Sequence, residues 1–201
     1  MGNPTIMPEI ETARLRLRLF TLNDLDDYGL LYSNPEFTKY SPKGAVPKEK
    51  AKEAALAACN YFIAHWQQHG FGVWAVTDKQ TGKLLGHCGL NFLPNSPEVE
   101  VLYRLDQPYW SQGIATEAAI ASLRYGFEEI KLDQIIAITK PEHVASRRVM
   151  EKAGLKYEKD AHYYNLDVVY YALWRTDYQP DDSLYVLKKD EAAFRSEQQT
   201  N

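Results

Sequence analysis

The stretch "QPYWSQGIATEAAIASLRYGF", residues 107–127, decides how this chain is interpreted. Gly113 separates an aromatic pair from a run with the pattern of a long amphipathic helix. A helix start exposes amide hydrogens that have no partner within the helix, and the helix dipole adds partial positive charge there. Because Gly113 has no side chain and Ala115 a small one, an anion can approach the amides of residues 112–116. The stretch therefore predicts an anion-binding helix start.

Two interpretations of Gly113 stay open at this level. A glycine is also common where a tight turn leads into a helix, and a lone glycine is a weak signal for a ligand. The chain contains neither G-x-x-x-x-G-K-[ST] nor G-x-G-x-x-G, the phosphate-binding motifs of ATP and dinucleotide sites. ATP and NAD are therefore not the expected ligands.

The composition indicates one soluble globular domain in 201 residues. Hydrophobic residues make up 45% and charged residues 25%, which argues against disorder. The net charge of −4 argues against nucleic acid as a partner. We expect no membrane span, because no run approaches about 20 apolar residues. We also expect no signal peptide, and read Cys59 and Cys88 as buried thiols in a reducing, cytoplasmic compartment.

The periodicity predicts a mixed α/β plan. The expected order is strand, two helices, three strands, helix, strand, helix and strand. These elements cover, in chain order, residues 14–20, 22–34, 47–69, 71–78, 83–93, 99–105, 113–130, 134–139, 146–154 and 168–174. The three central strands should form an antiparallel meander, and the last strand should close the sheet. The outward arginines of the first strand are interpreted as its solvent-facing side, and the polar chain after Asp177 as a weakly packed tail.

The opening stretch resembles motif A of the GNAT acyl-CoA N-acetyltransferases, whose core reads [RQ]-x-x-G-x-[GA]. The corresponding core here is Trp110-Ser111-Gln112-Gly113-Ile114-Ala115. Trp110 stands where the family usually has arginine or glutamine. This aromatic pair before the glycine is similar to the subfamily that acetylates the N termini of ribosomal proteins, the Rim-type enzymes.

A second segment, "PEHVASRRVMEKAGL" at residues 141–155, resembles motif B of that subfamily, N-x-x-S-x-x-V-x-x-K-x-G-F. Ser146, Val149, Lys152 and Gly154 match it, while His143 and Leu155 replace asparagine and phenylalanine. The resemblance implies one GNAT domain over residues 10–178, then a polar C-terminal tail over residues 179–201. It also implies the GNAT fold, a mixed central sheet with helices on both faces.

The resemblance implies acetyl-CoA as co-substrate. In the GNAT fold the third meander strand splays away from the strand after the motif A helix, and pantetheine lies in the gap. Backbone groups of Val101, Tyr103 and Leu105 should then bind its amides, because an unpaired strand edge offers free hydrogen-bonding groups. The diphosphate is expected on the amides of Gln112, Gly113, Ile114, Ala115 and Thr116. His143 either contacts the cofactor in place of the usual asparagine or is an ordinary loop histidine.

Acetyl transfer needs a neutral amine, a polarised thioester carbonyl and a hydrogen-bond donor for the leaving thiolate. Glu100 matches an acid that the subfamily carries on this strand. It is expected to be the base, directly or through water, or else a solvated residue or an anchor for the substrate ammonium. The amide of Leu102 is the candidate for polarising the carbonyl.

The acid that many GNAT enzymes take from a motif B tyrosine has no direct counterpart, because Met150 occupies that place. By resemblance Ser146 replaces it, although serine is a poor acid and would only hydrogen-bond the thiolate. A helix N-cap is the favoured interpretation of Ser146, with a cofactor contact as a second role.

The expected reaction is direct attack of a primary amine on acetyl-CoA. A protein N terminus is the first choice of acceptor, and a polyamine, amino acid or antibiotic the second. A non-catalytic acyl-CoA sensor is the alternative of another class. His65 and His69 have the spacing of a zinc pair, but the metalloprotease glutamate is missing, so no metal is expected. The chain is expected to be a monomer or a homodimer.

Overall fold

The computed structural model describes residues 7–41 and 44–190 and contains one mixed sheet. Within those residues the sheet has nine strands in the order β7-β8-β6-β5-β4-β3-β2-β1-β9. The strands are β1 Met7–Glu11, β2 Leu15–Arg18, β3 Val73–Asp78, β4 Leu84–Phe92, β5 Val99–Leu105, β6 Gln134–Thr139, β7 Lys156–Tyr163, β8 Leu166–Trp174 and β9 Val186–Asp190. The α-helices are α1 Leu25–Ser33, α2 Pro35–Thr38, α3 Ala51–His69, α4 Ile114–Glu128 and α5 Val144–Lys152. Short 3-10 turns cover Leu22–Asp24, Lys48–Lys50 and Gln107–Tyr109.

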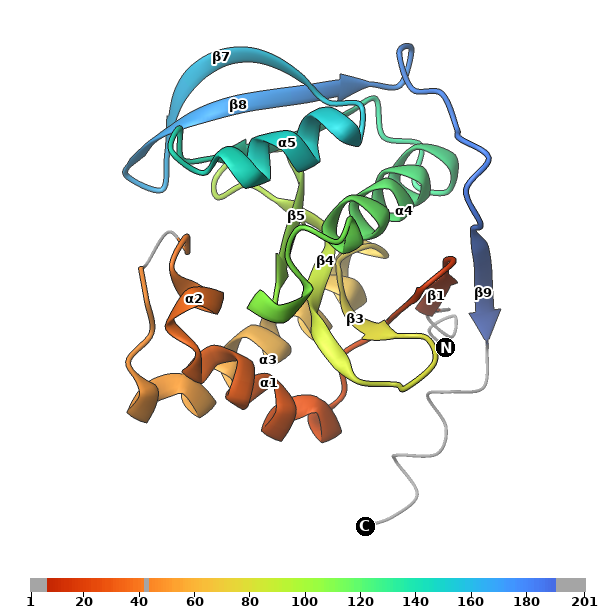
Figure 1. Ribbon diagram of the computed structural model, residues 1–201. Coiled ribbons are helices and arrows are strands. Elements are labelled where there is room, and N and C mark those ends of the chain that lie inside the picture. Colours follow the sequence, from red (N-terminus) through yellow and green to blue (C-terminus); the bar gives the residue numbers. More distant parts are fainter. Residues whose placement is uncertain (1–6, 42–43, 191–201) are drawn as a thin grey trace.

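Helices cover both faces of the sheet, which confirms the expected fold class (Figure 1). Strand β3 is buried on both of its faces, so helices must cover both faces of the sheet there. Val73 and Ala75 pack in a cluster with α1, α2 and most of α3, whereas Trp74 and Val76 pack in the cluster of α4 and α5. Successive side chains of a strand point to opposite faces, so a wholly apolar strand must lie between two layers.

The helix boundaries follow local signals in the sequence. The Asp24 carboxylate accepts the Thr21 amide at 2.8 Å, the capping-box contact expected at the start of the first helical segment. Gly70 ends α3 in the left-handed conformation, with φ 71°. Strands β3, β4 and β5 form the expected antiparallel meander.

Three strands were not expected from the sequence. β1 and β9 form one side of the sheet, and β7 forms the opposite edge, so the prediction that β8 closes the sheet is wrong. β7 was missed because most of its residues are exposed and charged, which gives no apolar alternation. Tyr164 and Asn165 join β7 to β8 with φ of 55° and 58°, the conformation of a tight hairpin turn.

The expectation of a weakly packed tail is wrong for its first part. Strand β9 pairs with β1, with Leu187 opposite Ile10. Lys188 forms an ion pair with Glu11, and Lys189 forms one with Glu129 at 2.6 Å. A polar segment can be a strand when a partner strand supplies its hydrogen bonds, and no local pattern reports that partner. Residues 191–201 of the tail lie outside the described residues, and the domain boundary at 178 stays a prediction.

Candidate active site

Strands β5 and β6 lie side by side at one point and then separate. They are parallel, and within the described residues their register contains a single pair, Glu100 with Ile136. Beyond it β5 continues to Leu105 with only β4 as a strand neighbour, while β6 pairs with β8. The edge of β5 beyond Glu100 therefore faces a gap, which agrees with the splay that the resemblance implies.

The start of α4 carries free amides at the far end of β5. Gly113 is the N-cap residue, with φ 78°, and its carbonyl accepts the amide of Glu117 at 3.0 Å. Among the described residues, no acceptor bonds the amides of residues 112–116. Backbone donors without a protein partner at a helix start form an anion site. The arrangement is the one expected for a diphosphate.

Arg14 links this helix start to the turn between β1 and β2. Its Nη1 donates to the Gln112 carbonyl at 2.8 Å, and its Nε donates to Glu117 at 2.6 Å. Glu117 also accepts the Thr12 hydroxyl at 2.7 Å. These contacts fix the turn between β1 and β2 against α4. Sequence reasoning treated Arg14 as solvent-facing, because nothing near it in the chain indicates a contact 98 residues away.

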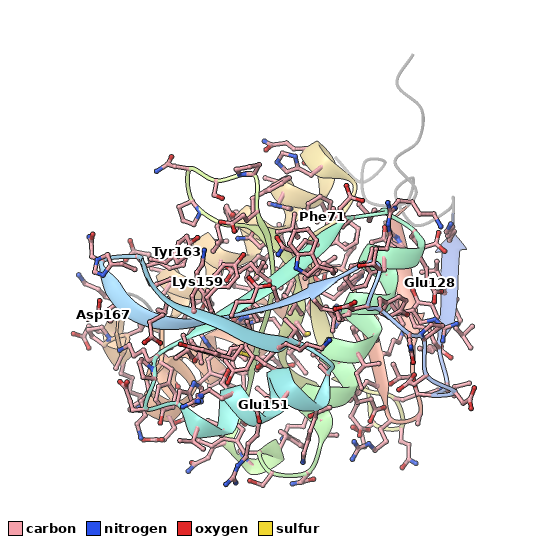
Figure 2. The ribbon with its side chains drawn as sticks, turned by 90° about the horizontal axis from the view of Figure 1, so that it is seen from above. Phe71, Glu128, Glu151, Lys159, Tyr163 and Asp167 are labelled. Atoms are coloured by element: carbon pink, nitrogen blue, oxygen red, sulfur yellow. The ribbon has the colours of Figure 1, made fainter. Side chains whose placement is uncertain are left out.

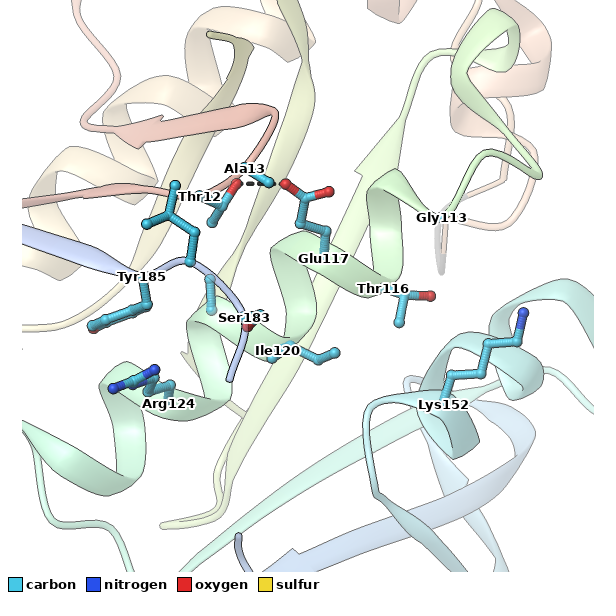
Figure 3. Close-up of a pocket in the computed structure, with 12 residues that line it drawn as sticks. Thr12, Ala13, Gly113, Thr116, Glu117, Ile120, Arg124, Lys152, Ser183 and Tyr185 are labelled. Atoms are coloured by element: carbon cyan, nitrogen blue, oxygen red, sulfur yellow. Dashed lines mark hydrogen bonds between the residues drawn. The ribbon is translucent and has the colours of Figure 1, made fainter. Parts of the chain in front are cut away.

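A cavity of about 330 Å³ opens beside the free amides (Figure 3). Gly113 and Thr116 lie at its α4 wall, and Lys152 reaches it from the end of α5. Ser183 and Tyr185, from the C-terminal segment, form another wall. The C-terminal segment thus lines a cavity beside these amides.

Glu100 is a buried carboxyl at the point where the strands separate. Its side chain is 7% exposed, and the Tyr164 hydroxyl donates to its Oε1 at 3.1 Å. Burial raises the pKa of Glu100 to about 7, although the Tyr164 hydrogen bond acts in the lowering direction. A carboxyl that titrates near neutral pH can accept a proton during catalysis and release it again.

Tyrosines surround this part of the sheet. The Tyr164 hydroxyl donates to Glu100, while those of Tyr163 and Tyr170 donate to Glu98 at 2.9 and 2.7 Å. Figure 2 shows Tyr163 on the β7–β8 ribbon. Burial raises the pKa of Glu98, but the hydroxyls of Tyr170, Tyr163 and Ser96 together with the charge of Lys159 leave that pKa below its ordinary value. Of these two acids, only Glu100 has a pKa near 7.

Two further polar residues near Glu100 were not anticipated. Asn91 lies directly across from Glu100 in the β4–β5 register. Its Oδ1 accepts the hydroxyl of Tyr61, from α3, at 2.8 Å. A sequence offers no signal for such a contact, because it depends on the register of two strands and on the rotation of a helix.

Ser146 lies on the other side of the gap and is bonded to Tyr103. The Tyr103 hydroxyl is 2.9 Å from the Ser146 carbonyl and 3.0 Å from its Oγ. The favoured interpretation of Ser146 as the N-cap of α5 is wrong. His143 holds that position, and Ser146 is the third helical residue. The helix begins three residues earlier than the sequence pattern indicated, and its first turn carries Ser146 to β5.

His143 is fixed by a stacked ring. It lies parallel to Tyr40, with ring centroids 3.6 Å apart, and its Nδ1 is 3.3 Å from the Thr139 hydroxyl. Burial lowers the pKa of His143 to about 4, so the ring is neutral at pH 7. Met150, in the place of the usual tyrosine, is buried in the core. Whether His143 contacts a cofactor stays a prediction.

The remaining predicted residues lie along β5. Leu102 pairs with Gly89 of β4, and its side chain packs against the cluster of α1 to α3. In this register the Asp106 amide donates to the Leu85 carbonyl, so the amide of Leu102, four residues earlier in the strand, also points at β4. The prediction that this amide polarises the thioester carbonyl is wrong. The Leu105 carbonyl already accepts the indole N–H of Trp110 at 2.7 Å. The structure thus brings Glu100, Leu102, Tyr103 and Ser146 together at one end of the gap and the amides of residues 112–116 to the other. The other roles of these residues stay predictions.

The described residues include no group of three or more potential metal ligands. His65 and His69 are neighbours, with ring centroids 4.6 Å apart, but the His65 Nδ1 bonds the Phe71 carbonyl at 2.8 Å. Both cysteines are free and buried, and burial raises their pKa values to about 12. In the part of the chain that is described, no helix has the length and apolar character to cross a bilayer.

Comparison with known proteins gives a consistent family. Residues 14–156 match the model of an acetyltransferase (GNAT) domain. The uncharacterized protein YkkB of Bacillus subtilis is 32% identical over 168 residues, 81% of this chain and 94% of that protein. A GNAT-family acetyltransferase from Bacillus anthracis superposes with a TM-score of 0.69 at 28% identity, over 84% of this chain and 99% of that one.

Two structures with lower sequence identity match this chain in fold alone. The ribosomal-protein-S5-alanine acetyltransferase from Vibrio fischeri has a TM-score of 0.67 at 21% identity and covers 86% of this chain and 99% of its own. Mycobacterium smegmatis RimJ, in complex with CoA-disulfide, has a TM-score of 0.66 at 18% identity, over 84% of this chain and 86% of its own.

Replacing Glu100 by glutamine should change how stability depends on pH. The pKa of Glu100 is 4.5 in its ordinary state and about 7 in the fold. The folded protein therefore binds this proton more tightly, and the stability it contributes is lost as pH rises from about 4.5 through 7. Glu100→Gln lacks this loss, so its free energy of unfolding should gain up to about 3 kcal/mol on wild type between pH 4.5 and pH 8. Urea denaturation across this range measures the difference.

Glu98→Gln is the matched control. Because the pKa of Glu98 is lowered in the fold, its removal should cost stability at pH 8, the opposite sign. A pH-independent difference between Glu100→Gln and wild type would contradict the buried, neutral-pH carboxyl.

Proposed function

Because this chain belongs to the GNAT acetyltransferase family, it is an N-acetyltransferase that uses acetyl-CoA, and we propose that its acceptor is the α-amine of a protein N terminus. The acceptor proposal rests on the buried Glu100 carboxyl, which lies where β5 and β6 separate and accepts the Tyr164 hydroxyl.

The cofactor is proposed to run along the free edge of β5. Its diphosphate lies on the amides of Gln112, Gly113, Ile114, Ala115 and Thr116, where the absence of acceptors among the described residues supports an anion. The pantetheine arm bonds backbone groups of Val101, Tyr103 and Leu105 in the manner of an added strand. Because β5 runs from the diphosphate end of the site back to Glu100 and Leu102, the thioester lies near these two residues.

The chemistry follows from groups on the two sides of the thioester. The ammonium of the acceptor gives a proton to Glu100, directly or through water, and the neutral amine attacks the acetyl carbonyl. The Leu102 amide takes no part in this step, because it faces Gly89 of β4 and not the free edge of β5. A C–N bond forms, the C–S bond breaks and coenzyme A departs as a thiolate, which then takes up the second proton that the nitrogen loses as it becomes an amide. Ser146 lies across the gap and donates to the sulfur.

The pKa of the base favours an α-amine. An α-ammonium has a pKa of about 7.7 to 8.0, so transfer of its proton to a base of pKa near 7 is uphill by about 1 unit, roughly 1.4 kcal/mol. A lysine or polyamine ammonium, with a pKa near 10.4, requires about 3 units, roughly 4 to 5 kcal/mol. The name of the Vibrio fischeri neighbour, a ribosomal-protein acetyltransferase, supports the same acceptor class.

A screen of acceptors tests the function. Wild-type protein should release free thiol from acetyl-CoA in the presence of peptides with a free α-amine. A peptide with a blocked N terminus and one lysine should react at least tenfold more slowly at pH 7.5, because Glu100 is too weak a base for it. Thiol release is followed with a chromogenic disulfide, and the acetylated position is found by mass spectrometry.

The other outcomes of the screen separate the alternatives. Turnover of polyamines, free amino acids or aminoglycosides in preference to peptides would show a small-molecule acceptor. Tight binding of acetyl-CoA without thiol release on any amine would show a sensor.

Glu100→Gln should lower kcat by about 100-fold or more, because a glutamine cannot accept the proton. In wild type, kcat/KM should rise with pH through a pKa near 7. Tyr164→Phe should shift this rise to higher pH, since the lost hydrogen bond stabilises the carboxylate. Full activity with an unchanged pH profile in Glu100→Gln would exclude the base role, and Glu98→Gln serves as the control for a nearby acid.

Gly113→Ala should raise the KM for acetyl-CoA by about tenfold or more. The new Cβ lies at the amides that bind the diphosphate, 3.5 Å from the Arg14 Nη2. Gly70→Ala is the matched control, because Gly70 also flanks a helix at positive φ but has open space around it. Both variants should lose about 1 kcal/mol of stability. An equal KM in the two variants would contradict the diphosphate site.

A further inference from the structure

We propose that the hydroxyl of Tyr103 positions Ser146 so that the serine hydroxyl donates to the coenzyme A sulfur as the thiolate leaves. This inference rests on the proposed function and concerns the leaving-group side of the same site. It makes Tyr103 a positioning residue through its side chain, in addition to the backbone contact expected of it.

The geometry links two elements that border the gap. Tyr103 lies on β5 and Ser146 on the first turn of α5, and their hydroxyl oxygens are 3.0 Å apart. Tyr103 is also 2.9 Å from the Ser146 carbonyl. Ser146 is 7% exposed, so few hydrogen-bond partners are within reach of its hydroxyl.

These distances allow two hydrogen-bond arrangements. With the gap empty, Tyr103 donates to the Ser146 carbonyl, and the Ser146 hydroxyl donates to Tyr103. When a thiolate forms, the Ser146 hydroxyl turns to the sulfur, and Tyr103 donates to the Ser146 oxygen instead. Only O–H rotation is needed, and a serine that accepts a hydrogen bond becomes a stronger donor.

Strand alternation places this pair opposite the base. Side chains of β5 at even positions, including Glu100 and Leu102, point to the face of α1 to α3, while Tyr103 packs with the cluster of α4 and α5. The amine is thus deprotonated on one face of β5, and the sulfur departs toward the other. Expulsion of the thiolate away from the entering amine follows from this arrangement.

Tyr103 acts as a donor that keeps its proton. Burial raises the pKa of Tyr103, so the hydroxyl stays protonated at every working pH. Met150 is 2% exposed and has no proton to donate. The Tyr103–Ser146 pair is therefore the hydrogen-bond donor for the sulfur. The partial positive charge at the start of α5 adds to the stabilisation of the thiolate.

The test begins with Tyr103→Phe, which removes the hydroxyl and keeps the ring. With acetyl-CoA we expect kcat to fall about tenfold while the KM for the acceptor changes less than twofold. Tyr125→Phe is the matched control, because the Tyr125 hydroxyl bonds only the Gly70 carbonyl, at 3.1 Å, away from the gap. It should lose similar stability and keep its kcat.

Acetyl-seleno-CoA separates a leaving-group role from a packing role. A selenol is a stronger acid than a thiol, so its anion leaves without a hydrogen-bond donor. Tyr103→Phe should therefore match wild type within about twofold on this donor. A similar loss on both donors would overturn the proposal, because damage to the site slows any leaving group.

A double-mutant cycle tests whether Tyr103 acts through Ser146. Ser146→Ala should also slow acetyl-CoA turnover, and Tyr103→Phe should cause no further loss in that background. Multiplied losses in the double variant would overturn the proposal while the acetyltransferase function stands. Absence of turnover in wild type on every acceptor would instead remove the proposed function and this inference together.

Discussion

The structure depends on a strand edge that is left unpaired inside a sheet. After Glu100 and Ile136 the backbones of β5 and β6 separate, although both strands continue. Buried backbone groups without partners cost free energy, so such an opening needs support from its surroundings. Here α4 and α5 cover it, and the Tyr103–Ser146 contact joins β5 to α5 where strand pairing is absent. In the proposed complex the pantetheine arm would pair with this edge.

The gap also explains the electrostatics of the site. Glu100 lies at its closed end, where burial disfavours its charge and leaves one hydroxyl as its partner. The fold gives up stability at neutral pH to keep this carboxyl there, which is common for groups tuned for proton transfer. At the other end the amides at the start of α4 have no acceptor among the described residues, and Arg14 is paired with Glu117. One strand thus runs from a buried carboxyl to a set of unbonded backbone amides.

The C-terminal segment has a structural part in this arrangement. β9 extends the sheet beyond β1, and Tyr185 forms a wall of the cavity beside Gly113. The turn between β1 and β2, which bears Thr12 and Arg14, bonds to Glu117 of α4. Strands β1 and β9 lie side by side (Figure 1), and residues next to them in the chain, Arg14 and Tyr185, border α4.

The sequence by itself determined the family, the mixed fold, the meander and most helix boundaries, because Gly70, Gly113 and the Thr21–Asp24 pair act through their own backbone and near neighbours. Only the tertiary structure decided the rest. β1, β7 and β9 exist because other strands pair with them, and Ser146 bonds Tyr103 instead of capping its helix. Two hydrogen bonds, from Arg14 to Gln112 and from Tyr164 to Glu100, join residues far apart in the chain. Short-range rules act within a turn or a strand, whereas these contacts follow from how the layers pack.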